Sequence, residues 1–275
     1  MNFPDMKKIA TSLLLVLLTV ALASAQRQEK KFDSFSRISF RTAGKLYLRQ
    51  GSPQKFEIEG DKEYIEELDI RVEGDRLVIG KDNWKGWNWR DDDNKVTVYV
   101  TMPTVEGLSV SGSGDLIGET KITAQRLNLA VSGSGSLTLD ADVSGDVDAD
   151  LSGSGRIDLK GKCRDFDTHV SGSGRIELNL AVVERATFGV SGSGKVRASG
   201  TAQEAKATIS GSGQVLAANL VVDICDVRIS GSGDVEINVN KELDANISGS
   251  GTVTYKGSPA HVNSHSSGSG SVRKF

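Results

Sequence analysis

The chain has 275 residues, of which 31 are glycine, 4 are proline and 2 are cysteine, and 25% are charged. Its 33 Lys and Arg residues against 36 Asp and Glu residues leave no positive surplus for a phosphate backbone, so we do not expect nucleic-acid binding. An aromatic content of only 5% favours a thin or repetitive architecture with small aliphatic layers over one large core.

Residues 1–25 have the pattern of a secretory signal peptide. Lys7 and Lys8 precede an uncharged apolar run at 9–22, and residues 23–25 read Ala-Ser-Ala, a small-residue cleavage site. A membrane anchor is less favoured, because a helix over that run reaches only about 21 Å against a hydrocarbon core of about 30 Å. We therefore expect export to the periplasm or outer cell surface, with no transmembrane segment in the mature chain.

After a linker at 26–34, residues 35–110 read as a series of β-strands. Glu73-Gly74-Asp75 lies between two alternating runs and predicts a tight hairpin. This region is expected either to cap a repetitive fold or to start it with irregular coils, because an uncovered end exposes free N–H and C=O groups. The predicted strands are 35–40, 45–50, 55–59, 68–73, 76–81 and 95–102.

Three tryptophans, Trp84, Trp87 and Trp89, precede the acidic run 91–94 between two of these strands. Exposed tryptophans can stack on sugar rings and clustered oxygens can hold Ca²⁺, so a glycan-binding loop is one interpretation. The alternative, which we favour, is that these large aromatic side chains fold back over an apolar end of the fold.

Residues 111–275 are dominated by a repeat. The tetrad Ser-Gly-Ser-Gly occurs nine times at intervals of 18 to 21 residues, which demands a structural unit and not a flexible linker. Around each tetrad, apolar residues and glycines alternate with polar residues, the period of a strand with one buried face. The third copy shows the apolar set: Val147, Ala149, Leu151, Gly153, Gly155, Ile157 and Leu159.

This alternation predicts an all-β fold, a single-stranded parallel β-helix (β-solenoid) with about 19–20 residues per coil. Each repeat would contribute one extended stretch of about a dozen residues closed by a short irregular segment, and equivalent strands would stack about 4.8 Å apart. Both glycines of each tetrad have inward parity, which allows a sharp bend or a close approach of the walls.

With these features in view, the chain resembles the bacterial family of autotransporter-adhesin head domains, also called GIN domains, typical of exported proteins in Bacteroidetes. The resemblance rests on FSRI at 35–38, DRLVI at 75–79, VTVYVTMP at 96–103 and the serial tetrads from Val110 onward. It implies a right-handed β-helix on the cell surface or in the periplasm, and it supplies no catalytic residues.

Stacking of coils predicts a cluster of candidate ligand-binding residues. Asp148, Asp150, Asp167 and His169 would lie together on one face, whereas Arg175 lines up with Arg156 and Lys195 just after the glycines. β-Helical polysaccharide lyases and hydrolases use such carboxylates and basic residues, so an enzyme is the main alternative. The simpler interpretation is a solvated face with weak cross-strand ion pairs.

No recognisable hydrolase motif supports an enzyme, because the sequence contains neither HExxH nor G-x-S-x-G. We therefore predict an exported, non-enzymatic adhesin or scaffold module without a cofactor, whose partner is a cell-surface glycan or an envelope protein. A polysaccharide lyase or hydrolase and a periplasmic accessory protein are the alternatives. Cys163 and Cys225 fall about three coils, or about 14 Å, apart, too far for a disulfide.

Overall fold

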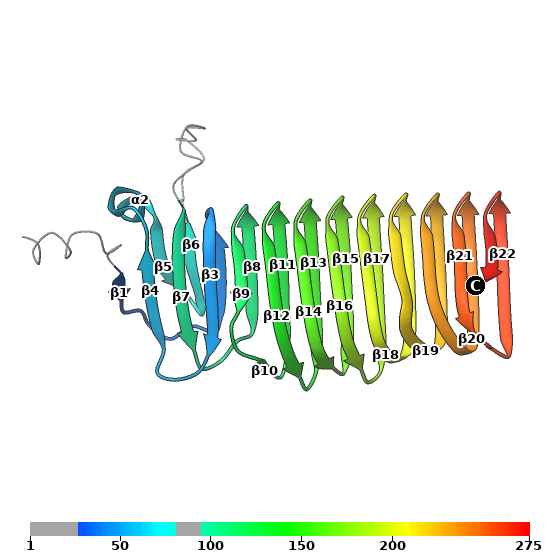
Figure 1. Cartoon of the computed structure of the whole chain (residues 1–275), viewed down its shortest axis with the longest axis horizontal. Coiled ribbons are helices and arrows are strands. Elements are labelled where there is room, and N and C mark those ends of the chain that lie inside the picture. Colours follow the sequence, from blue (N-terminus) through cyan, green and yellow to red (C-terminus); the bar gives the residue numbers. More distant parts are fainter. Residues whose placement is uncertain (1–26, 81–94) are drawn as a thin grey trace, which may run out of the picture.

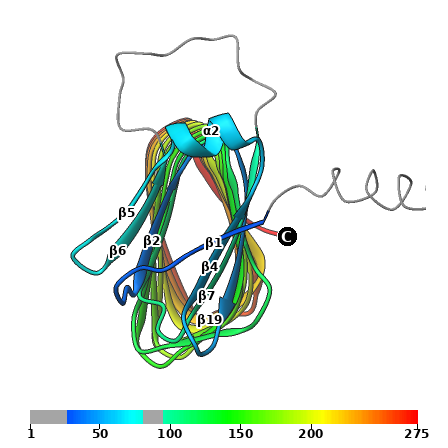
Figure 2. The same ribbon diagram turned by 90° about the vertical axis from the view of Figure 1, so that its left-hand side faces the viewer.

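The computed structural model describes residues 27–80 and 95–275. Their strands form one continuous sheet that wraps around a narrow core as a rod (Figure 1). Viewed along the rod, the wrapped sheet has two long walls that face each other (Figure 2). The fold is thus the predicted parallel β-solenoid; the hand of its coil, implied only by the resemblance, stays a prediction.

Wall 1 is formed by strands that pair in the following order along the rod. They are β5 (Asp69–Glu73), β6 (Arg76–Gly80), β2 (Arg37–Arg41), β8 (Gly107–Gly112), β11 (Leu127–Gly133), β13 (Asp146–Gly153), β15 (Asp165–Gly172), β17 (Arg185–Gly192), the second halves of β18 (Lys195–Gly211), β19 (Gln214–Gly231) and β20 (Asp234–Gly249), and β22 (His261–Gly268).

Wall 2 is formed by the remaining strands and by the first halves of the three long ones. Its order is β1 (Gln28–Lys30), β4 (Lys55–Glu59), β7 (Val96–Met102), β3 (Gly44–Gln50), β9 (Asp115–Gly118), β12 (Ser136–Val143), β14 (Arg156–Cys163), β16 (Arg175–Val182), then β18, β19, β20, β21 (Thr252–Gly257) and β23 (Ser271–Lys274), with β10 (Ile122–Ala124) beside the end of β12.

Each tetrad forms a corner, so a coil contains two strands and not the single extended stretch expected from the alternation. Gly153, the first glycine of its tetrad, has φ of 104°, and a Cβ there would lie 2.7 Å from the Gly133 carbonyl oxygen. Only the second glycine, Gly155, is buried. The inward parity therefore holds for the second glycine alone, because the first one makes the bend. We call this corner of the solenoid the tetrad edge.

The core between the walls is a stack of aliphatic layers. Ile157 and Val235 are buried, as the alternation predicts, and Phe166 and Phe188 lie in neighbouring coils with ring centroids 6.3 Å apart. Equivalent residues of successive repeats stand in register along wall 1, from Gly112 to Gly268. The register means that any outward residue faces its equivalents in the coils before and after it.

The N-terminal coils are continuous with the repeats but do not follow chain order. The coil at the end of the rod contains β6 and β7. The coil of β2 and β3 comes next, and the coil of β8 and β9 follows it. Antiparallel strands cover the outer edges: β5 pairs with β6, and β4 and β1 continue beyond β7. The predicted hairpin at Gly74 is thereby confirmed as the β5–β6 turn, whereas β1 falls inside the segment predicted as a linker.

One helix, α2 (Lys62–Glu67), lies at this end of the rod (Figure 2) and was not predicted from the sequence. Asp61 caps it, because its carboxylate accepts a hydrogen bond from the Tyr64 backbone N–H at 3.0 Å. Ile65 is its one buried residue. Six residues are too few for the 3.6-residue period to stand out from an otherwise alternating pattern.

Candidate functional site

Wall 1 brings together four of the residues that the sequence singled out. Asp148 and Asp150 on β13 stand in register with Asp167 and His169 on β15, in that order. Their side chains point outward because they alternate with buried positions on both strands. Three carboxylates and one imidazole thus form a block across two coils that lie about 4.8 Å apart.

Two shallow depressions adjoin this block on the outer surface of wall 1. They measure about 240 and 320 Å³ and share Ser109, Ala130 and Asp150. Ala130 stands in register with Ser109 on one side and Asp150 on the other. The small side chains of Ala130 and Ser109 leave the surface of wall 1 lower at these two positions. We call the two adjoining depressions the wall-1 groove.

The groove is basic at one end and acidic at the other. Arg37 of β2 and Arg76 of β6 line the end toward the N-terminal coils, and Asp148 lines the opposite side of the same depression. Arg37 is partly neutralised, because its buried Nε lies 3.3 Å from an Asp75 carboxylate oxygen without a hydrogen bond and its Nη2 lies 4.0 Å from Glu106 Oε2. The arrangement suits an extended polar ligand with both donors and acceptors.

Serine hydroxyls of the tetrads border the other depression. The first serines of four successive tetrads line it in register, next to Asp150 and His169. They offer a row of donors and acceptors with the repeat of the coil. These four are Ser111, Ser132, Ser152 and Ser171.

Burial raises the pKa of the Asp167 carboxyl above its ordinary value, and the negative charges of Asp148 and Asp150 act in the same direction. The neighbouring charges of His169 and Lys206 oppose this shift. The block therefore holds a proton on Asp167 more readily than an isolated aspartate would.

Arg175 does not belong to this surface. It is the first residue of β16 on wall 2, in register with Arg156 and Lys195, and its outward side chain faces away from the wall-1 groove. Its nearest carboxylate is Glu177, with Nε 3.8 Å from Oε1. Trp84, Trp87 and Trp89, and the acidic run that follows them, lie outside the described residues.

Sequence reasoning missed Arg37, Arg76, Ser109 and Ala130 as groove residues. The signal for Ser109 and Ala130 was present, because both occupy the repeat position of Asp150. No such signal existed for Arg37 and Arg76, which lie outside the repeats and reach the groove only because β2 pairs with β8.

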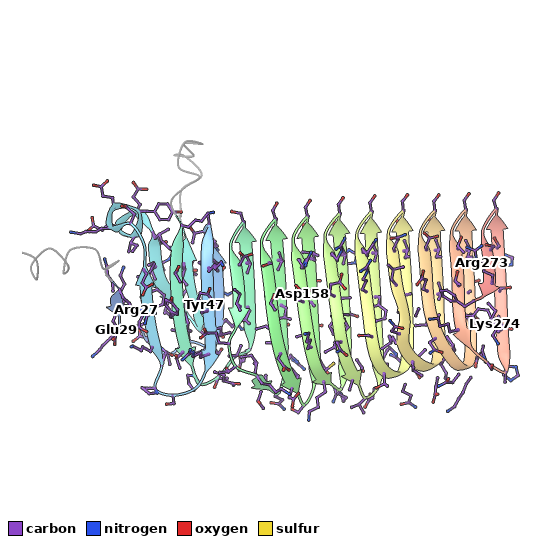
Figure 3. All side chains as sticks on the ribbon, viewed as in Figure 1. Arg27, Glu29, Tyr47, Asp158, Arg273 and Lys274 are labelled. Atoms are coloured by element: carbon purple, nitrogen blue, oxygen red, sulfur yellow. The ribbon has the colours of Figure 1, made fainter. Side chains whose placement is uncertain are left out.

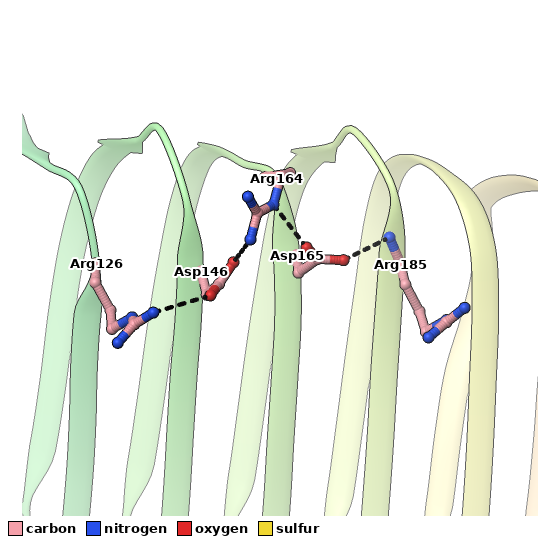
Figure 4. A network of polar contacts seen from close by, with 5 residues as sticks. All are labelled: Arg126, Asp146, Arg164, Asp165 and Arg185. Carbon is pink, nitrogen blue, oxygen red and sulfur yellow. Dashed lines mark hydrogen bonds and ion pairs between the residues drawn. The ribbon is translucent and has the colours of Figure 1, made fainter.

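A second set of charged residues lies at the edge opposite the tetrads, where the chain turns into wall 1 (Figure 4). Asp146 Oδ2 is 3.5 Å from Arg126 Nη2, and its Oδ1 is 2.5 Å from Arg164 Nη2. Arg164 Nε also lies 2.9 Å from Asp165, which accepts a hydrogen bond from the Arg185 backbone N–H at 3.3 Å. We call this edge, with its alternating signs, the paired edge.

In residues 27–80 and 95–275, no group of three or more His, Cys, Asp or Glu side chains is arranged so that it could hold a metal ion. Both cysteines in this part of the chain are free and buried, and burial raises the pKa of each thiol to about 12. None of the helices in the described ranges is long and apolar enough to span a membrane.

Solved structures from Bacteroidetes share this fold. A "putative lipid binding protein" from Parabacteroides distasonis has a TM-score of 0.68 at 24% identity, and covers 91% of this chain and 96% of its own. A "putative adhesin" from Parabacteroides merdae has the same TM-score at 21% identity, with coverage of 91% and 95%. No curated protein gave a significant match.

A family profile matches most of the repeat region and the N-terminal coils. It aligns with residues 34–198 and again with 177–259, which together span well over half of the chain. The matched residues include the opening strand segment at 35–38 and eight of the nine tetrads. The chain therefore belongs to the family described as "Putative auto-transporter adhesin, head GIN domain".

Proposed function

We propose that this protein is an exported, non-enzymatic adhesin-like module that holds an extended polar ligand in the wall-1 groove. The ligand class that fits is a cell-surface glycan or a polar segment of an envelope protein. Residues 1–25 would direct export, residues 26–34 would follow as a linker, and residues 35–110 and 111–275 would form the capped start and the repeats of the binding rod.

The adjoining pair of depressions over Ser109, Ala130 and Asp150 carries this proposal. Their exposed lining is mostly apolar, which suits the faces of sugar rings, while the polar side chains among the lining residues, such as Asp150 and His169, can bind sugar hydroxyls. Their shallow shape suits a chain that lies along the surface. The adhesin description of the family supports the same role.

The test is a glycan array probed with the purified mature protein, followed by calorimetry on the glycans that bind. Ala130→Phe fills the groove, and Asp150→Ala removes a shared polar group; each should weaken binding by about tenfold or more. Asp244→Ala removes the same charge from wall 1 several coils away and should leave affinity unchanged. Equal affinity in all three variants would contradict the proposal.

A polysaccharide lyase or hydrolase is the second candidate, because the raised pKa of Asp167 beside two carboxylates is a property of general acids. The same glycans, incubated with the protein and analysed for released oligosaccharide, distinguish the two. Binding without release favours the adhesin, and release that Asp150→Ala abolishes favours the enzyme.

A further inference from the structure

Wall 2 carries a row of three cations on the side of the rod opposite the groove. Arg156, Arg175 and Lys195 are the first residues of β14, β16 and β18, and they stand in register on three successive coils. Their side chains point outward because the next residue of each strand is buried in the core. Adjacent members of the row are therefore separated by about one strand spacing, about 4.8 Å.

These cations have few counter-charges. Among the described residues, neither Arg156 nor Lys195 forms an ion pair within 4.0 Å. Arg175 has only Glu177, which lies 3.8 Å from its Nε and also 3.9 Å from Arg197 Nη1. Arg175 Nε is buried without a hydrogen-bond partner, but 43% of the surface of this side chain is exposed. The exposed parts of these cationic side chains are thus left to bind something outside the chain.

The row has defined ends. In the coil before Arg156, Ser136 donates a hydrogen bond to Asp115 at 2.5 Å, and in the coil after Lys195, Gln214 donates one to Asp234 at 3.2 Å. Asp115 and Asp234 therefore accept hydrogen bonds from uncharged side chains at the two ends of the row. The result is a basic strip three coils long, and we call it the wall-2 strip.

An acidic and mixed row flanks the strip and limits its width. Asp158 and Glu177 stand beside Arg156 and Arg175 on the same strands. They belong to a row that runs along wall 2 from Tyr47 to Arg273, with Asp158 near its middle (Figure 3). A broad anionic surface such as a membrane or a duplex would meet these carboxylates, whereas a single narrow chain would not.

We propose that the wall-2 strip binds a short stretch of anionic polysaccharide that runs along the rod, with carboxylate or sulfate groups on successive sugars. Like charges directly opposed on neighbouring strands are destabilising, and a ligand with one anion per coil removes that repulsion. Two of the three positions are arginines, whose planar fork binds a carboxylate or a sulfate through two hydrogen bonds. This site is independent of the wall-1 groove and of its ligand.

The test measures calorimetric affinity for oligogalacturonates of one to six sugars, and for sulfated oligosaccharides of the same lengths, in about 50 mM NaCl. The fully methyl-esterified oligogalacturonates are the neutral control probes. The triple variant Arg156→Gln/Arg175→Gln/Lys195→Gln is compared with Lys206→Gln/Arg228→Gln/Lys241→Gln, which removes three cations from wall 1 and the edge of the rod. Whichever anion class binds tighter identifies the chemistry of the ligand.

We expect affinity to rise up to about three sugars and then level off, and to fall at least about tenfold in the strip variant. The control variant and the esterified probes separate a specific site from net charge. The strip variant should unfold at the same temperature as the wild type or a higher one, which shows that it is folded. Equal losses in both variants, equal binding of the esters, or no binding of either anionic class would overturn the proposal.

Discussion

The two long edges of the solenoid, the tetrad edge and the paired edge, hold successive coils together in different ways. At the tetrad edge the backbone itself turns, because Gly153 has a positive φ that residues with side chains rarely adopt. The hydrogen-bond ladder continues around this corner: the Ser154 backbone N–H donates to the Gly133 carbonyl oxygen at 2.9 Å. At the paired edge, side chains of alternating sign connect successive coils (Figure 4).

The difference shows that the effect of a charged side chain on stability depends on which residues stand beside it in the neighbouring coils. In both places the fold stacks equivalent residues of neighbouring repeats. At the paired edge the equivalent residues, Asp146 and Asp165, carry the same sign, but Arg164 contacts both carboxylates and bridges them. On wall 2 the equal charges of Arg156 and Arg175 oppose the stack. Because the tetrad edge is held by its backbone, the adjacent wall-2 strip is free to carry charges that serve a ligand.

The largest effect is expected at the tetrad edge itself. Gly153→Ala would force a side chain into positive φ and place its Cβ 2.7 Å from the Gly133 oxygen, so we expect a loss of about 2 kcal/mol or more in the free energy of unfolding. Ser154→Ala, at the exposed neighbour, should change it by less than about 0.5 kcal/mol. Urea unfolding followed by circular dichroism measures both, and similar losses would show that the corner does not depend on glycine.

A smaller loss is expected at the paired edge. Asp146→Asn leaves Arg126 and Arg164 without their shared carboxylate, and because the pairs are partly exposed we expect a loss of about 1 kcal/mol that shrinks in high salt. Asp244→Asn, outside this network, is the control. A loss that does not respond to salt would mean that packing, and not charge, holds the edge.

The opposite sign is expected for the wall-2 strip. Arg175→Gln removes the central member of a like-charged row, so the free energy of unfolding should stay constant or rise by a few tenths of a kcal/mol. The same urea titrations provide the measurement. If this variant is less stable than Asp146→Asn, the contrast between the two edges fails.

The smallest effect concerns Asp167 on wall 1. Because its pKa is raised in the folded state, its contribution to stability is present at low pH and is lost as the pH rises through the folded pKa. Asp167→Asn should therefore unfold at a slightly higher temperature than the wild type at pH 7, and the difference should disappear as the pH falls below the ordinary aspartate range. A difference that grows with acidity would contradict the assignment.

Much of this structure could be predicted from the sequence, because the spacing of the tetrads shows which residues of successive coils stand side by side. The tetrads predicted the solenoid, the buried faces of Ile157 and Val235, and the proximity of Asp150 to His169. A sharp bend at the tetrad glycines was one of two predicted possibilities, but the inward parity predicted for Gly153 was wrong, because alternation counts side-chain parity and does not report φ. Arg37 and Arg76 could not be placed in the groove, because the pairing of β2 with β8 skips over β3 to β7 and leaves no local pattern.

The central claim is that equivalent residues of successive repeats stand side by side, and cross-linking tests it most directly. Ser152 and Ser171 are in register one coil apart, about 4.8 Å, whereas Ser152 and Ser191 are two coils apart, about 10 Å, beyond the limit of about 7 Å for a disulfide. After mild oxidation, peptide mapping should find a disulfide in Ser152→Cys/Ser171→Cys and none in Ser152→Cys/Ser191→Cys. Failure of the first pair, or equal cross-linking of both, would contradict the account.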